Sequence, residues 1–147
     1  MSEFRILIVD DYAPFRDVLS RIIAESQTLP ALRVVCEAWD GLVAVREAER
    51  FQPHLTLLDI GIPGLDGIKA ARIIRVVAPE SKLIFISGYS SEALVREAMS
   101  TGAHGFIAKI DVLRDLSAAV QAVFLDKQFI SGRLAGYNFP PSGHAIQ

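Results

Sequence analysis

Short apolar runs alternate with amphipathic segments along most of the chain. Five of these runs are apolar at nearly every position and are rich in Val, Ile and Leu. Continuous runs of this kind are typical of strands that are buried on both faces of a parallel sheet. The predicted strands are Phe4–Val9, Leu32–Cys36, Leu55–Leu58, Leu83–Ile86 and Gly105–Ala108.

The segments between the runs each have one apolar face. Between Phe15 and Ile23, apolar residues recur at intervals of three and four, which is the spacing of an amphipathic helix. The last such segment shows the same spacing at Leu113, Leu116, Val120 and Val123. Five strands in strict alternation with five helices predict an α/β fold with one parallel sheet. Helices are expected to begin near Ala13, between Trp39 and Leu42, and near Gly64, Ser90 and Asp111.

The periodicity and the composition of the sequence change at about residue 127. Beyond it the helical period is lost, and glycine, proline and serine become frequent between Gly132 and Gly143. We therefore expect residues 1–127 to form one domain. Residues 128–147 are predicted to be a tail or linker that is poorly ordered unless it docks.

Composition excludes several classes of protein. The chain has 147 residues and a net charge of −2, and its 15 Lys and Arg form no basic block, which argues against direct contact with nucleic acid or an anionic membrane. Its one cysteine, Cys36, excludes an internal disulfide framework. We find neither a signal peptide nor an apolar run near the ~20 residues of a membrane span, and we expect a cytoplasmic protein.

Four of the five predicted strands end in a side chain that carries chemistry. Asp10 and Asp11 close the first strand, Asp59 the third, Ser87 the fourth and Lys109 the fifth. Binding residues of an open parallel sheet gather beyond the carboxyl ends of its strands, where the strand order reverses. The sequence therefore predicts that these five side chains share one site.

Each of these residues also has an ordinary structural explanation. Asp11 alone fits a helix N-cap, Ser87 could open a turn ahead of the better N-cap candidate Ser90, and Lys109 could be a solvated surface charge. In combination these residues favour a functional site, because three gathered carboxylates repel one another unless a cation is present. A divalent ion and Lys109 together would balance them. Oxygen-only ligands favour magnesium or manganese, and open metal positions suit a phosphoryl group.

At these positions the chain resembles the response-regulator receiver family of two-component signalling. The resemblance runs from about Phe4 to Lys127 and is nearest to receivers that precede helix-turn-helix DNA-binding domains. It is carried by the segments ILIVDDYAPFR, LTLLDIGIPGLDGIKAARIIR, LIFISGYSSEALVREAMSTGAHGFIAK and DLSAAVQAV. It implies a flavodoxin-like (βα)5 three-layer sandwich with a parallel sheet of order 2-1-3-4-5.

The resemblance also implies roles for individual residues. Asp59 would accept a phosphoryl group from a sensor histidine kinase or a phosphotransfer protein. Asp11, Asp59 and the Gly61 carbonyl would ligate Mg²⁺ directly, and Asp10 would act through water. Ser87 and Lys109 would contact phosphoryl oxygens. Ser87 and Phe106 are the implied switch residues, although Phe106 has no hydroxyl and must act through packing alone.

Further expectations follow from the same resemblance. The chain would be a signalling phosphoacceptor that catalyses only its own phosphorylation and dephosphorylation, and look-alikes commonly dimerise on activation. Ile110 stands where Pro is common in the family. Because Gly61 and Gly88 flank the acceptor without side chains, we expect the phosphoryl group to be open to water and short-lived.

Three other functions compete with this interpretation. A phosphatase of the haloacid-dehalogenase type needs an Asp two residues after the nucleophile, where this chain has Gly61. A nucleotide-binding module needs a glycine-rich loop after the first strand, where this chain has Asp10 and Asp11. The third is a receiver fold that serves as a protein-interaction module independently of phosphorylation.

Overall fold

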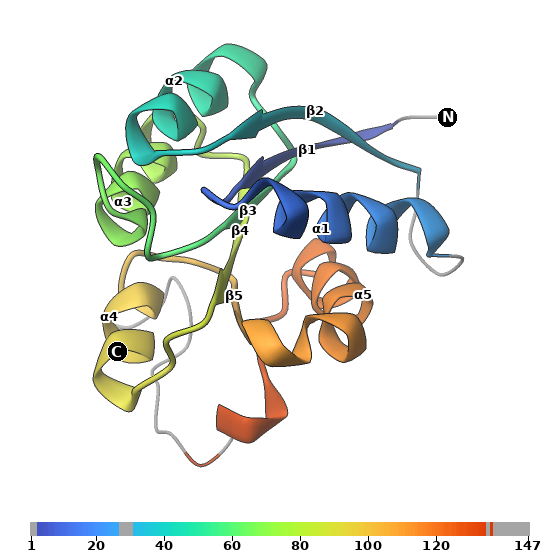
Figure 1. Cartoon of the computed structure of the whole chain (residues 1–147), viewed down its shortest axis with the longest axis vertical. Helices are drawn as coiled ribbons and strands as arrows, with labels where there is room; N and C mark the ends of the chain where they lie inside the picture. The colour runs from blue at the N-terminus through green and yellow to red at the C-terminus, as the bar shows by residue number, and fades with distance from the viewer. Residues whose placement is uncertain (1–2, 27–30, 135, 137–147) are drawn as a thin grey trace.

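The computed structural model describes residues 3–26, 31–134 and 136, and its centre is one parallel sheet (Figure 1). The strand order is β2-β1-β3-β4-β5-β6, so the predicted order 2-1-3-4-5 is confirmed and a short strand is added beyond β5. The strands are β1 (Phe4–Val9), β2 (Leu32–Ala38), β3 (Leu55–Leu58), β4 (Lys82–Ser87), β5 (Gly105–Ala108) and β6 (Phe129–Ile130).

Five α-helices cover the two faces of the sheet and complete a three-layer α/β sandwich of the flavodoxin-like type. Figure 1 shows α1 and α5 together on one face, with α2, α3 and α4 on the other. The helices are α1 (Ala13–Glu25), α2 (Gly41–Phe51), α3 (Gly67–Val77), α4 (Glu92–Met99) and α5 (Val112–Phe124). Two 3-10 turns are η1 (Lys109–Asp111) and η2 (Gly132–Leu134).

Alternate residues of each strand enter two separate apolar cores. In β1, Ile6 and Ile8 pack with α1 and α5, whereas Leu7 and Val9 pack with the three helices of the other face. In β5, Phe106 belongs to the second core and Ile107 to the first. This burial on both faces explains why the central strands are apolar at most positions.

Several local expectations need correction. Ser91, not Ser90, caps α4, because its side chain accepts the Leu94 amide hydrogen bond. Helix α3 begins at Gly67, since Gly64 has a φ of +75° in the preceding turn. Leu113 does not join the buried face of α5 and is 78% exposed.

The chain beyond residue 127 continues along the edge of the sheet before it leaves the described part. Strand β6 pairs with β5 in parallel, with Phe129 opposite Gly105 and Ile130 opposite Phe106. Residues 137–147 of the predicted tail lie outside the described residues, and the boundary at residue 127 stays a prediction. Among the described residues, no helix is long and apolar enough to cross a membrane.

Candidate functional site

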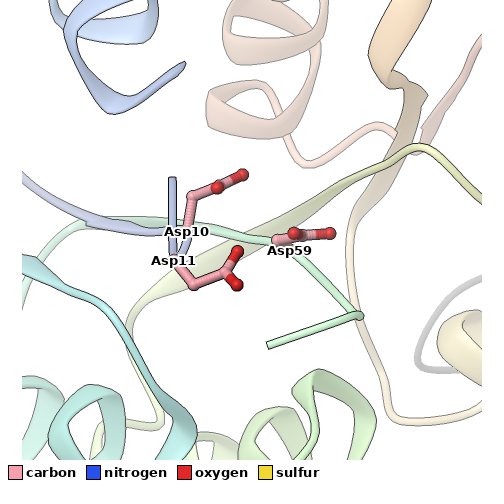
Figure 2. Close-up of side chains that lie close together, drawn as sticks. All are labelled: Asp10, Asp11 and Asp59. Atoms are coloured by element: carbon pink, nitrogen blue, oxygen red, sulfur yellow. The ribbon is translucent and has the colours of Figure 1, made fainter. Parts of the chain in front are cut away.

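The strand order places the candidate acidic residues on neighbouring strands. From β1 the chain crosses over to β2 on one side, and β3 then returns to pair with β1 on the other. Asp10 and Asp11 follow β1, and Asp59 follows β3, so all three lie at the carboxyl edge of the sheet (Figure 2). One carboxylate oxygen of each lies within 4.8 Å of the others.

Burial makes this acidic cluster electrostatically demanding. Asp10 is 1% exposed and Asp59 is 8% exposed, while Asp11 faces solvent. Burial raises the pKa of Asp59, and the charges of Asp10 and Asp11 add to this effect. The Lys109 ammonium and the Gly61 amide act in the opposite direction without cancelling it. A buried carboxylate with this residual repulsion is a site prepared for a cation.

Lys109 reaches into the cluster from the end of β5. Its Nζ lies 2.8 Å from Asp10 Oδ2 and 3.6 Å from Asp59 Oδ2. Burial on its own would lower the Lys109 pKa, but the hydrogen bonds and charges of the two aspartates outweigh it and leave the pKa raised. Lys109 therefore stays protonated and balances one of the three negative charges.

Phe15 supports this lysine in a way that the sequence did not reveal. The Lys109 Nζ lies 4.3 Å from the centre of the Phe15 ring, within the range of a cation–π contact. In the sequence, Phe15 is one more apolar residue at helical spacing. No local signal separates it from core residues such as Leu19, because the contact depends on how α1 docks against the sheet.

The backbone around Asp10 is fixed by two further contacts. Asp10 Oδ1 accepts a hydrogen bond of 2.8 Å from the Tyr12 amide. Arg16 donates to the Asp10 carbonyl at 2.6 Å and to Glu37 at 2.7 Å, which ties the ends of β1 and β2 together. Tyr12 is the N-cap of α1 without a side-chain hydrogen bond, so Asp11 is not used as the cap. The Asp11 carboxylate is instead one of the three that form the acidic cluster.

Tight backbone packing sets the position of Asp59. A Cβ atom at Gly67 would lie 2.2 Å from the Asp59 carbonyl oxygen and 2.6 Å from the Ile60 Cα, so only glycine allows α3 to begin there. The Gly67 amide also donates to the Ile60 carbonyl at 2.9 Å. The start of α3 therefore holds the loop after β3 in place.

The remaining predicted residues lie at the same edge or just behind it. The Gly61 amide donates to Asp59 Oδ1 at 3.3 Å, and a side chain at Gly61 would meet the Tyr89 ring at 3.6 Å. Ser87 is buried and its hydroxyl accepts the Tyr89 amide hydrogen bond at 3.0 Å. Phe106 is fully buried in β5, with its ring centre 6.2 Å from that of Phe85. Tyr89 is the second neighbour of the site that the sequence analysis missed.

Comparison with known proteins identifies the family. The sequence model of the response regulator receiver domain matches residues 6–121, which is most of the chain. The transcriptional regulatory protein DegU of Brevibacillus brevis is 32% identical over 122 residues, covering 83% of this chain and 49% of DegU. The chemotaxis protein CheY of Listeria monocytogenes is 34% identical over 105 residues, covering 71% of this chain and 85% of CheY. The chain belongs to the response regulator receiver family of two-component systems.

Solved structures agree with this assignment. A LuxR-family two-component response regulator from Aurantimonas is 28% identical with a TM-score of 0.83, covering 92% of this chain and 95% of that one. The receiver domain of a NarL regulator from Mycobacterium tuberculosis is 30% identical with a TM-score of 0.75, covering 82% and 95%. The chain spans about half of DegU and 60% of the Pseudomonas protegens response regulator GacA, so these relatives extend well beyond it.

The donor set fits the ion that the family implies. Receiver domains are signalling domains that bind Mg²⁺ at an acidic pocket, and Asp10, Asp11 and Asp59 form such a cluster here. Hard oxygen donors and an excess of two negative charges over Lys109 suit magnesium better than a softer metal.

Proposed function

We propose that this chain accepts a phosphoryl group on Asp59 and uses it to switch a protein-interaction surface. The observation that carries the proposal is the buried Asp59 carboxylate, which lies with Asp10 and Asp11 within 4.8 Å and faces the Lys109 ammonium at 3.6 Å. Acidic groups gathered with one fixed cation suit phosphoryl transfer, where catalysis is mostly positioning and charge stabilisation.

The proposed donor is a phosphohistidine of a sensor kinase or phosphotransfer protein. An Asp59 oxygen attacks phosphorus, the new P–O bond forms as the donor's P–N bond breaks, and the leaving imidazole retains the electron pair and takes up a proton. Lys109 stabilises the negative phosphoryl oxygens, and Ser87 donates its hydroxyl hydrogen to one of them. Water later cleaves the acyl phosphate, which releases inorganic phosphate and restores Asp59.

Asp11, Asp59 and the Gly61 carbonyl would hold Mg²⁺, with Asp10 acting through water. When bound, the ion supplies positive charge that neutralises the carboxylates and the phosphoryl oxygens. The CheY of Borrelia burgdorferi, 28% identical with a TM-score of 0.76 over 82% of this chain, has been solved with CheX, beryllofluoride and magnesium. That relative supports the same ligand chemistry at this acidic cluster.

The switch is proposed to run from Ser87 to Phe106. When Ser87 turns to the phosphoryl group it gives up its contact with the Tyr89 amide, and the neighbouring Phe106 ring repacks in the core beside Phe85. The readout would be the surface formed by α4, β5 and α5. New hydrogen bonds at the site need only shift an equilibrium between two conformations.

The decisive experiment is labelling with acetyl phosphate and Mg²⁺, followed by intact mass and peptide mapping. We expect the wild-type chain to gain one phosphoryl group and the Asp59→Asn variant to gain none. Asp17→Asn is the matched control, because Asp17 is an exposed aspartate on α1. It should label like the wild type. Equal labelling of Asp59→Asn would show that another residue is the acceptor.

The same experiment tests the competing function, an interaction module that works without phosphorylation. Such a module would take up no label and would show no Mg²⁺ binding by calorimetry at the acidic cluster. Label that depends on Mg²⁺ and on Asp59 would exclude it.

A further inference from the structure

Residues Phe129–Leu134, here called the C-terminal strap, begin with β6, which pairs with β5, the strand that directly precedes Lys109. The family model ends at residue 121, so the strap is outside the segment that it matches. The Phe129 amide donates to the His104 carbonyl and the Ser131 amide to the Phe106 carbonyl, each at 3.0 Å. Leu134 is 2% exposed and packs into the same core as Phe106.

Ser131 fastens the strap at the end of β5. It is fully buried, and its Oγ accepts the Ala108 amide hydrogen bond at 3.0 Å. The same hydroxyl donates to Asp115 Oδ2 on α5 at 2.9 Å. One side chain of the strap therefore joins β5 to α5 immediately before Lys109.

Arg133 makes the second attachment, just after Lys109. Its Nε donates to Asp111 Oδ2 at 2.6 Å and its Nη2 donates to Asp111 Oδ1 at 2.9 Å, which makes a bidentate ion pair. Paired hydrogen bonds of this geometry fix orientation as well as distance. Asp111 ends the η1 turn that begins at Lys109. The strap is therefore attached both before this turn, through Ser131 at Ala108, and at its end, through Arg133 at Asp111.

Lys109 is the link between this turn and the acidic cluster. Its ammonium lies closer to Asp10 than to Asp59, at 2.8 Å against 3.6 Å. A phosphoryl group on Asp59 adds negative charge on the Asp59 side and draws the ammonium away from Asp10. The backbone that holds Lys109 runs from Ala108 to Asp111 and carries the two attachments of the strap, so any displacement of this backbone acts directly on them.

We propose that the strap is a latch whose docking is coupled to phosphorylation of Asp59, so that the phosphorylated chain releases it from β5. This rests on the proposed function. Release exposes the backbone hydrogen-bonding edge of β5 beside Phe106. A change of charge at the acidic cluster would thereby expose a new surface. Coupling between two sites is reciprocal, so weakening the strap must also favour phosphorylation.

Hydrogen exchange on the full chain tests the release directly. Exchange is followed by NMR with and without beryllofluoride and Mg²⁺, and again after acetyl phosphate, with occupancy of Asp59 read by mass. We expect the Phe129 and Ser131 amides to exchange roughly tenfold faster in the occupied state. The His54 amide, which donates to the Arg5 carbonyl at 2.8 Å at the other end of the sheet, is the internal reference and should not change.

Variants of the strap test the reciprocal effect. Arg133→Gln removes the paired attachment from a half-exposed side chain, and Ser131→Ala removes the buried one. Both should raise the affinity for beryllofluoride in the presence of Mg²⁺ several-fold. Gln128→Ala, an exposed position just ahead of the strap, is the matched control and should bind beryllofluoride as tightly as the wild type. Arg133→Gln decides the matter if Ser131→Ala folds poorly.

The outcomes separate this proposal from the one that it rests on. A phosphorylated chain whose strap amides exchange as before, or an Arg133→Gln variant that binds beryllofluoride with the wild-type affinity, would overturn the latch and leave the acceptor role intact. A wild-type chain that takes up neither phosphoryl nor beryllofluoride would overturn both.

Discussion

The two ends of the sheet use their enclosed polar side chains in opposite ways, with half-buried histidines at the amino end and buried aspartates at the carboxyl end. At the amino end, His54 Nδ1 accepts the Arg5 amide hydrogen bond at 2.9 Å, and His104 Nδ1 accepts the Leu83 amide at 3.1 Å. Burial lowers the pKa of both rings, to about 4 for His104, so both are neutral at pH 7. Each ring satisfies a backbone donor at the start of a strand and carries no net charge.

At the carboxyl end the buried groups are charged and only partly balanced. Asp10 and Asp59 share Lys109, and burial together with mutual repulsion raises the pKa of Asp59. The contrast shows which polar residues at strand ends serve the fold and which serve a ligand. A neutral group that closes a backbone hydrogen bond is satisfied, whereas gathered like charges in a buried site retain a need for a cation.

The largest expected effect concerns the rigid backbone of the carboxyl end. Gly67→Ala should lower the free energy of unfolding by about 3 kcal/mol, because the new methyl would meet the backbone of Asp59 and Ile60, which cannot yield as a side chain can. Urea unfolding followed by circular dichroism measures this loss.

Gly88→Ala is the matched control for Gly67→Ala. A Cβ at Gly88, at the same end of the sheet, would meet nothing within 4 Å, so the change in stability should stay within about 0.5 kcal/mol. Equal losses in the two variants would contradict the close approach of α3 to the acceptor loop.

The next effect comes from removing the positive charge of the site. Lys109→Ala leaves the buried Asp10 without its partner and should cost about 2 kcal/mol, less than a fully buried pair because Lys109 is 28% exposed. Added Mg²⁺ should restore stability more in this variant than in the wild type, since the ion replaces the lost charge. Thermal unfolding with and without Mg²⁺ measures both quantities.

Two variants control for the loss of Lys109. Lys69→Ala removes an exposed lysine that lies 4.0 Å from Asp66, and it should change stability very little. Combining Lys109→Ala with Asp10→Asn removes the orphaned charge and should recover much of the loss. If the double variant were as unstable as the single one, the charge pairing of Asp10 and Lys109 would not be the cause.

The sequence was sufficient for the main strands and for the convergence of the acidic residues. Strands buried on both faces are apolar at most positions, and parallel strands bring their carboxyl ends to one edge, so the sequence alone places Asp10 and Asp59 together. Lys109 followed from the same rule. These inferences depend on patterns that extend over whole helices and strands, so an exceptional residue does not change them.

Features decided by tertiary contacts were beyond the sequence. Strand β6 has only two residues, too few for any periodicity. It forms because it pairs with the edge of β5 and because the next residue, the buried Ser131, accepts a hydrogen bond from the Ala108 amide. Ser90 and Ser91 are alike in type, and only the direction of the chain into α4 makes Ser91 the cap. The contact of Lys109 with Phe15 likewise exists only once α1 has docked.

The smallest expected effect tests the amino end through its pH dependence. The pKa of His104 is lowered from 6.5 to about 4 by burial and by the nearby charges of Arg75 and Lys82. Between these values the unfolded chain binds the proton and the folded chain does not, so stability falls as the pH drops from 6.5 towards 4. Because the ring is only partly enclosed, we expect its contribution to this fall to be about 1.5 kcal/mol, less than half of what the full shift would give.

His104→Asn isolates that contribution, because the Asn oxygen can accept the Leu83 amide hydrogen bond without titrating. The variant should match the wild type near pH 7.5 and should lose less stability between pH 6.5 and 4, as measured by urea unfolding at a series of pH values. His54→Asn should flatten the curve less, since the pKa of His54 is lowered less. A wild-type slope in His104→Asn would mean that the fall originates at the carboxylates of the other end, and the division of roles between the two ends would not hold.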